Sequence, residues 1–268
     1  MKIIVLIFFL ILFIFPIKAD VKKDENDFIV EASRIASNIY TPMEEIYYLL
    51  KIPNLEIYKL KSKNDIKYLN SKKDFKIGFN DNIKCDRSNK DNLKKKFSII
   101  EKNLNIYKST FLKKNNVKFI VLCENLFISE HNTGGVYDIN KRTLILDINF
   151  NPKHFERMIH HEVFHMIKDS HKEVFDEIKW KLFNKETFNY SECSACSDRK
   201  NLNLYKKTDG FTTEYSKTIP SEDMAEIFSF MMTERNEIEN KIRYDKILND
   251  KVNYIKSNLY LIDSTFNF

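Results

Sequence analysis

The sequence predicts an α+β fold, in which a small mixed sheet is followed by a mostly helical C-terminal half. The apolar run at 117–122 is typical of a buried strand, and the segments 136–138 and 143–148 indicate further strands after a turn at Gly134-Gly135. The next segment, 152–168, carries apolar residues at helical spacing: Phe155, Met158, Ile159, Val163, Met166 and Ile167. The predicted strands thus come immediately before this helix.

Further helices are predicted on both sides of this strand–helix unit. Residues 89–114 form an amphipathic pattern whose apolar positions recur at intervals of four and three. Residues 24–51 are expected to be mostly helical, whereas 54–87 mix short apolar runs with Asn, Asp and Lys and give no clear assignment. The remaining predicted helices are 175–183, 220–233 and 238–262.

Residues 1–19 have the pattern of a cleaved signal peptide. Lys2 precedes an unbroken apolar run at 3–15, and Ala19 offers a small residue at the cleavage site before Asp20. A signal anchor is the alternative, but the run is shorter than the roughly twenty residues that a membrane span needs. No cysteine stands directly after the run, which argues against a lipoprotein anchor. We expect an exported, soluble mature chain without a membrane span.

Four cysteines follow the signal segment, and an even number in an exported protein suggests disulfides. We expect the pairs Cys85–Cys123 and Cys193–Cys196. The Cys193-Ser-Ala-Cys196 segment resembles half of a zinc ribbon, but the chain has no second pair of cysteines at this spacing to complete one.

The formal net charge of +6 gives no indication of a nucleic-acid partner. The lysines are scattered and interleaved with Asn, Asp and Glu, and no face combines basic with aromatic residues. A solvated surface explains this distribution better than nucleic-acid binding.

The most informative motif is His161-Glu162-Val163-Phe164-His165, which has the pattern His-Glu-x-x-His. Residues four apart on a helix lie one turn above each other, so both imidazoles can reach a single Zn²⁺ ion. Glu162 can then contact a water that the metal activates, as the general base does in zinc peptidases. Five of the six histidines lie within 154–171. This clustering favours a metal site over the alternative of two histidines on an ordinary helix.

A catalytic zinc site keeps three protein ligands and one open position, so a third ligand is required. His171 has the overall spacing of metzincins, but those enzymes need Gly where this chain has Lys168. Glu222 is favoured, because a second helix crossing behind the first can supply a carboxylate ligand. Glu226, one turn further on, can accept a hydrogen bond from a ligand imidazole and fix its tautomer. The alternative for both acids is a favourable charge in the first helical turn and a solvated face.

Several motifs resemble the putative zinc-binding metallopeptidase family. The segments that carry the resemblance are His160-His161-Glu162-Val163-Phe164-His165-Met166-Ile167, Trp180, Gly210-Phe211-Thr212-Thr213-Glu214-Tyr215 and Glu222-Asp223-Met224-Ala225-Glu226-Ile227-Phe228. They cover about residues 150–233. The family is similar to gluzincins of the anthrax lethal factor and Pro-Pro endopeptidase type, in which a tyrosine seven residues before the third ligand assists catalysis. Tyr215 and Glu222 have this spacing.

The resemblance implies a zincin-like metallopeptidase domain, with the edge strand of the sheet over the His-Glu-x-x-His helix. The expected organisation is a signal peptide at 1–19, an N-terminal mainly helical region at 20–115 and a zincin-like catalytic region at 116–268. Lys168 and the Cys193–Cys196 segment lie outside the family's pattern.

These features predict a secreted, gluzincin-type zinc metalloendopeptidase. One Zn²⁺ per chain is expected on His161, His165 and Glu222, with Glu162 as general base and Tyr215 as a hydrogen-bond donor to the oxyanion. The expected partner is a protein or peptide substrate, and the chain is expected to be a monomer. Two alternatives remain: a secreted zinc-binding adhesin or inhibitor-like protein without turnover, and a metzincin-like peptidase that uses His171.

Overall fold

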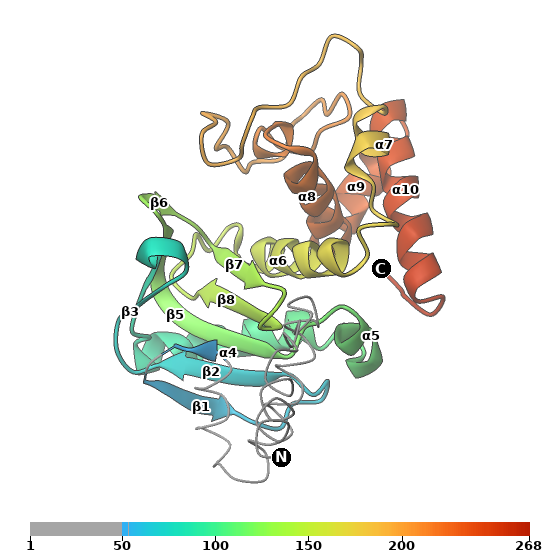
Figure 1. Cartoon of the computed structure of the whole chain (residues 1–268). Coiled ribbons are helices and arrows are strands. Elements are labelled where there is room, and N and C mark those ends of the chain that lie inside the picture. Colours follow the sequence, from blue (N-terminus) through green and yellow to red (C-terminus); the bar gives the residue numbers. More distant parts are fainter. Residues whose placement is uncertain (1–49, 53) are drawn as a thin grey trace, which may run out of the picture. The chain divides into compact units, whose positions relative to one another are not determined.

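The computed structural model describes residues 50–52 and 54–268, which belong to one unit of the chain (Figure 1). The expected signal peptide at 1–19 lies outside the described residues, as do residues 20–49 of the expected N-terminal region. Within the described part of the chain, no helix combines the length and the apolar character that crossing a membrane requires.

A mixed sheet is built around one long strand, β5 (Phe119–Ile128). The first half of β5 pairs in parallel with β2 (Lys67–Ser71) on one side and with β8 (Thr143–Asp147) on the other. Its second half pairs antiparallel with β4 (Ile83–Asp86) and with the short β6 (His131–Asn132). The first five residues of β5 are all buried, which matches the continuous apolar pattern of a central strand with parallel neighbours.

Three shorter strands extend the sheet. β1 (Leu55–Lys59) pairs antiparallel with β2, and β3 (Phe75–Ile77) pairs antiparallel with β4. A single 3₁₀ turn, η2 (Phe79–Asp81), connects β3 to β4. β7 (Gly135–Asp138) pairs antiparallel with β8 and with no other described strand, so it is an edge strand.

The helices α4 (Lys90–Leu104) and α6 (Phe155–Ser170) pack against each other and share one apolar core with the sheet. The side chain of Asn89 caps α4 by accepting hydrogen bonds from backbone N–H groups of its first turn. The short α5 (Ser109–Lys114) follows α4. α6 lies beside β7, so the edge strand and the helix with the His-Glu-x-x-His motif are neighbours (Figure 1).

The C-terminal half is arranged around α8 (Pro220–Thr233), nearly all of whose residues are buried. α8 packs against α6 on one side. It also contacts α7 (Glu177–Lys181), α9 (Arg235–Lys241) and α10 (Lys246–Ile262). This packing brings α6 and α8 together, although more than forty residues separate them in the chain.

The α+β class is confirmed, but the expected mainly helical region at 20–115 is wrong for residues 55–86, which form β1 to β4. These strands complete the same sheet as β5 and β8, because their pairing partners lie further along the chain. Two predicted helices are each divided: 89–114 becomes α4 and α5, and 238–262 becomes α9 and α10. At the second division Asp245 caps α10 by accepting a hydrogen bond from the backbone N–H of Leu248, which starts a new helix.

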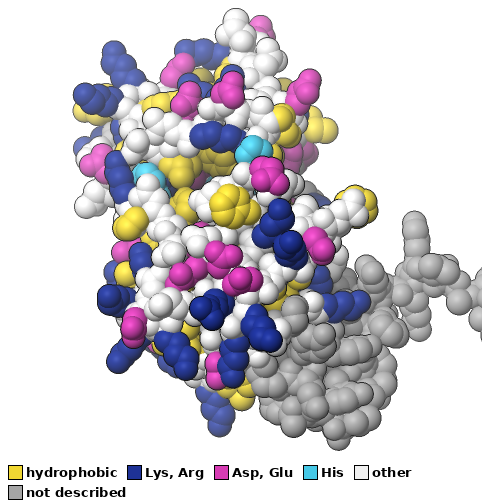
Figure 2. Space-filling view, turned by 90° about the vertical axis from the view of Figure 1, so that its left-hand side faces the viewer, with side chains coloured by type: hydrophobic (Ala, Val, Ile, Leu, Met, Phe, Trp, Pro, Cys, Tyr) yellow, Lys and Arg dark blue, Asp and Glu magenta, His cyan; other side chains and the backbone are white. Residues whose placement is uncertain are grey.

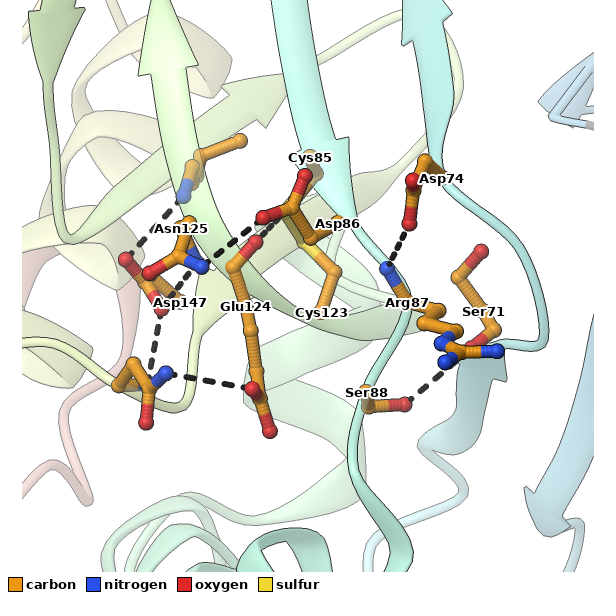
Figure 3. The surroundings of a disulfide bond; sticks show 12 residues. Ser71, Asp74, Cys85, Asp86, Arg87, Ser88, Cys123, Glu124, Asn125 and Asp147 are labelled. Atoms are coloured by element: carbon orange, nitrogen blue, oxygen red, sulfur yellow. Dashed lines mark hydrogen bonds between the residues drawn. A yellow bond between two sulfur atoms is a disulfide. The ribbon is translucent and has the colours of Figure 1, made fainter.

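Both expected cysteine pairs are confirmed as disulfides. Cys85–Cys123 joins the neighbouring strands β4 and β5 (Figure 3). Close to it, the buried carboxylate of Asp147 accepts hydrogen bonds from the backbone N–H groups of Asn125 and Leu126. These bonds satisfy backbone N–H groups of β5 just after its pairing with β8 ends.

Candidate active site

The two histidines of the motif lie one turn apart on α6, and their Nε2 atoms are 3.1 Å from each other. Both imidazoles are buried, His161 at 7% and His165 at 5% exposure. The apolar face of α6 packs into the core, so the sequence that forms the helix also fixes where the two rings lie.

Glu222 reaches the same point from the first turn of α8. Its Oε2 atom lies 2.8 Å from Nε2 of His161 and 3.4 Å from Nε2 of His165. Within the described part of the chain, His161, His165 and Glu222 are the one group of side chains whose arrangement could hold a metal ion. The sequence predicted Glu222 as the favoured third ligand, and the packing of α8 on α6 brings its side chain to the two histidines.

The geometry of this group fits zinc. Two imidazole nitrogens and one carboxylate oxygen are the donor set of a catalytic zinc site with an open position. Ligands at about 2.0–2.1 Å from a tetrahedral zinc are about 3.3 Å from each other. The three separations between the donor atoms, 3.1, 2.8 and 3.4 Å, are close to that value.

The second nitrogen of each imidazole has its own partner. Nδ1 of His161 donates to Oε1 of Glu226 at 3.0 Å, and Glu226 also accepts a hydrogen bond from the Thr213 hydroxyl at 2.8 Å. Nδ1 of His165 lies 3.2 Å from the Ser221 hydroxyl. These contacts orient both rings so that their Nε2 atoms face Glu222.

The buried imidazoles and carboxylates of this group shift each other's pKa. Burial alone would lower the pKa of His161, but its hydrogen bonds with Glu222 and Glu226 raise that pKa to about 10. Burial alone would raise the pKa of Glu222, but the imidazoles of His165 and His161 lower it well below its usual value. Since an imidazole binds a metal in its neutral form, a metal at this group would displace a proton from His161.

Glu162 lies beside the three donors and outside their group. Its side chain is 7% exposed, and it borders a cleft of about 490 Å³ together with His161. Burial raises the pKa of Glu162, while the nearby His161 and His165 lower it. A carboxyl group with a raised pKa at the edge of a cleft has the character of a general base.

Tyr215 borders the same cleft from the 3₁₀ turn η3 (Tyr215–Lys217). Its ring centroid lies 6.1 Å from that of His161. Burial and the carboxylates of Glu222 and Glu162 raise the pKa of Tyr215 well above its usual value. The phenol thus keeps its proton and can act as a hydrogen-bond donor.

The cleft opens on the side of the molecule where β6 lies. Figure 2 shows this side, with hydrophobic side chains in a hollow, histidine side chains at its border and charged side chains spread over the surrounding surface. The lining of the cleft includes β6, the first turns of α6 and, from the Cys193–Cys196 loop, Ser194 and Ala195.

His171 does not join the group. It is the C-cap of α6, its Nδ1 lies 3.7 Å from Glu173, and it is not among the residues that could share a metal with His161. The helix continues through Lys168 to Ser170, and this carries His171 past the point at which the other two imidazoles meet.

Three residues of the site were not singled out from the sequence. Ser221 and Thr213 hold the second nitrogen of His165 and the carboxylate of Glu226, and Tyr137 of β7 stacks on the His165 ring at a centroid distance of 5.1 Å. Ser221 directly precedes the candidate ligand Glu222, which could have drawn attention to it. Thr213 lies in the motif segment that ends at Tyr215, which could also have drawn attention to it, whereas Tyr137 carries no such signal, because only the tertiary fold brings it to the site.

Residues 98–260 match a family described as putative zinc-binding metallo-peptidase. The match includes β5 to β8, α6 and α8, and with them every residue of the site described in this section. No curated protein matches the chain. Since the matched residues make up more than half of the sequence, the chain belongs to this family of zinc-binding metallo-peptidases.

Proposed function

We propose that this protein is a secreted zinc metalloendopeptidase of the gluzincin type. The observation that carries the proposal is that Glu162 and Tyr215 border one cleft together with His161. His161 is the member of the donor group, with His165 and Glu222, that lines this cleft. A site that binds zinc only for structure fills all four positions with protein ligands and needs no base.

His161, His165 and Glu222 would hold one zinc ion per chain. Zinc bound there supplies a Lewis acid, which lowers the pKa of a water molecule towards 7 and polarises the scissile carbonyl. Glu226 keeps the proton of His161 on Nδ1, so that Nε2 carries a free electron pair towards the metal position.

Glu162 serves as the general base in this proposal. Its carboxylate takes a proton from the attacking water and then passes it to the leaving amine. Tyr215 donates a hydrogen bond to the oxyanion that forms on the former carbonyl oxygen. The raised pKa of Tyr215 supports this role, because a phenolate could not donate.

An extended peptide is the substrate that the surroundings favour. Among the described strands β7 pairs with β8 alone and lies next to α6, and a peptide can pair with the other edge of such a strand through backbone hydrogen bonds. The resemblance to the lethal factor and Pro-Pro endopeptidase group agrees with a peptide substrate.

Export is supported by the apolar segment at 3–15 and by the two disulfides, which persist in oxidising compartments. The mature chain would begin at or near Asp20.

The substitution Glu162→Gln tests the proposed chemistry. It keeps the size of the side chain but removes the base, so hydrolysis of a fluorescently labelled denatured protein should fall to below a few per cent of wild type. Zinc measured by atomic emission should stay near one per chain, since Glu162 is not a ligand. Activity above that level in zinc-replete Glu162→Gln would show that another group is the base.

A further inference from the structure

Glu162 is held in place by packing. Among the described residues, its carboxylate has no hydrogen-bond or ion-pair partner, and the nearby groups act on it only through their charge. Its position beside the donor group must therefore depend on what surrounds its carbon atoms. Glu162 itself belongs to α6, and its side-chain carbon atoms lie against β7.

The residue of β7 that meets Glu162 is Gly135. A Cβ atom added to Gly135 would lie 2.4 Å from Cγ of Glu162, 2.7 Å from its Cδ and 3.0 Å from its Oε1. Carbon atoms in contact are normally about 3.5–4.0 Å apart. The Glu162 side chain thus occupies the space that the Cβ atom of any other residue at 135 would need.

The need for glycine at this position is steric. Within the described residues, the glycines with positive φ are Gly78 and Gly210, so Gly135 adopts a backbone conformation that other residues can also adopt. Gly135 is paired with Leu146 of β8 and is itself buried. An alanine would fit the strand, and the three atoms nearest to its Cβ would all belong to Glu162.

We propose that Gly135 is a positioning residue for the general base, because its missing side chain lets the edge strand approach α6 and confine Glu162 beside the metal group. This inference rests on the proposed function for the role of Glu162. A methyl group at 135 turns the Glu162 side chain away, while the donor atoms of His161, His165 and Glu222 stay where they are.

The first experiment is kinetic and uses Gly135→Ala in the full chain. We expect kcat on a defined peptide substrate to fall by about 10²-fold, the order of loss for a catalytic group displaced by about 1 Å. KM and the zinc content should stay within about twofold of wild type, because the substitution leaves the ligands untouched. A kcat within twofold of wild type would overturn the proposal.

Gly134→Ala is the matched control. It adds the same methyl group to the neighbouring residue, where a Cβ would lie 2.6 Å from Cγ of Met158 and 2.9 Å from the ring of Phe150. The crowding is similar, but Glu162 is not its target. A kcat loss in Gly134→Ala as large as that in Gly135→Ala would mean that crowding of the strand in general lowers the rate, against the proposal.

The second experiment is thermal unfolding, which needs no activity. Gly135→Ala should lower Tm by about 5 °C in the wild type, but should leave Tm unchanged in a Glu162→Ala background, where the conflicting atoms are absent. Gly134→Ala should lower Tm by the same amount in both backgrounds. An equal Tm loss for Gly135→Ala in both would contradict the contact.

The two experiments separate this inference from the proposed function. If the wild type proves inactive with zinc bound, the peptidase proposal fails, while the thermal comparison still reports whether Gly135 confines Glu162. If Gly135→Ala alone does not fold, its recovery in the Glu162→Ala background gives the same answer.

Discussion

At the scale of single residues, the site depends on the hydrogen-bond partner that each imidazole has at its second nitrogen. His161 uses Nδ1 to donate to Glu226, and His165 places Nδ1 next to Ser221. Both Nε2 atoms are thereby directed to Glu222, which arrives from another helix. Of all the assignments, Glu222 as third ligand distinguishes the gluzincin proposal from its metzincin alternative.

We therefore predict opposite outcomes for Glu222→Ala and His171→Ala. Zinc sites are worth about 10–16 kcal/mol shared among four ligands, so the loss of Glu222 should weaken zinc binding by about 10²–10³-fold. His171→Ala should leave both zinc affinity and rate close to wild type. Competition with a chromophoric chelator measures the affinities. Zinc loss in His171→Ala with retention in Glu222→Ala would reverse the assignment.

Tyr215→Phe should give a third phenotype. The phenol is not a ligand, so zinc content and KM should be retained, while kcat falls by about 10²-fold, as for the loss of one oxyanion donor. Steady-state kinetics on a defined peptide separates the two constants. A rise in KM with unchanged kcat would instead indicate that Tyr215 only helps to bind the substrate.

At the scale of secondary structure elements, α8 must keep its register for Glu222 to reach α6. Directly after Glu222, the buried Asp223 accepts hydrogen bonds from Trp180 of α7, at 2.8 Å, and from Tyr190, at 2.7 Å. It also pairs at 2.7 Å with Lys251 of α10, and both side chains are fully buried. Burial raises the pKa of Asp223 and lowers that of Lys251, so each charge depends on the other.

Lys251→Met should destabilise the fold by about 3–5 kcal/mol, because it leaves the charge of Asp223 buried without its partner. The added substitution Asp223→Asn should recover part of this loss. Lys246→Met, at the exposed start of the same helix, is the control and should change stability by less than about 1 kcal/mol. Chemical unfolding measures all three. If the double variant is less stable than Lys251→Met, the unpaired charge is not the cause.

The sequence predicted the elements that carry the site better than those that support it. α6 and α8 were predicted within about three residues, because helical periodicity, Pro220 and the acidic first turn are local signals. The strands at 55–86 were not predicted, since each is short. The pairing of β2 and β4 with β5 is decided by long-range packing. For the same reason Tyr137 could not be assigned to the site in advance.

At the scale of the whole molecule, the site joins two parts of the chain that the sequence keeps apart. α6 follows the sheet, α8 follows the long segment with the Cys193–Cys196 disulfide, and the candidate ligands come from both helices. A metal held by both helices should therefore stabilise the fold in addition to its chemical role.

Removal of the metal should lower Tm by about 10 °C, since zinc at 1,000 times its Kd contributes about 4 kcal/mol. Addition of zinc should restore the original Tm. His161→Ala, which lacks one proposed ligand, should unfold at the same temperature with and without chelator. A chelator effect of equal size in wild type and His161→Ala would place the stabilising metal elsewhere.

Anomalous scattering at the zinc edge, measured on a crystal of the wild-type protein, tests the central claim most directly. The account predicts a single strong peak per chain, about 2.0–2.2 Å from Nε2 of His161, Nε2 of His165 and a carboxylate oxygen of Glu222. A peak bound by His171, or no peak between α6 and α8 in zinc-replete crystals, would contradict it.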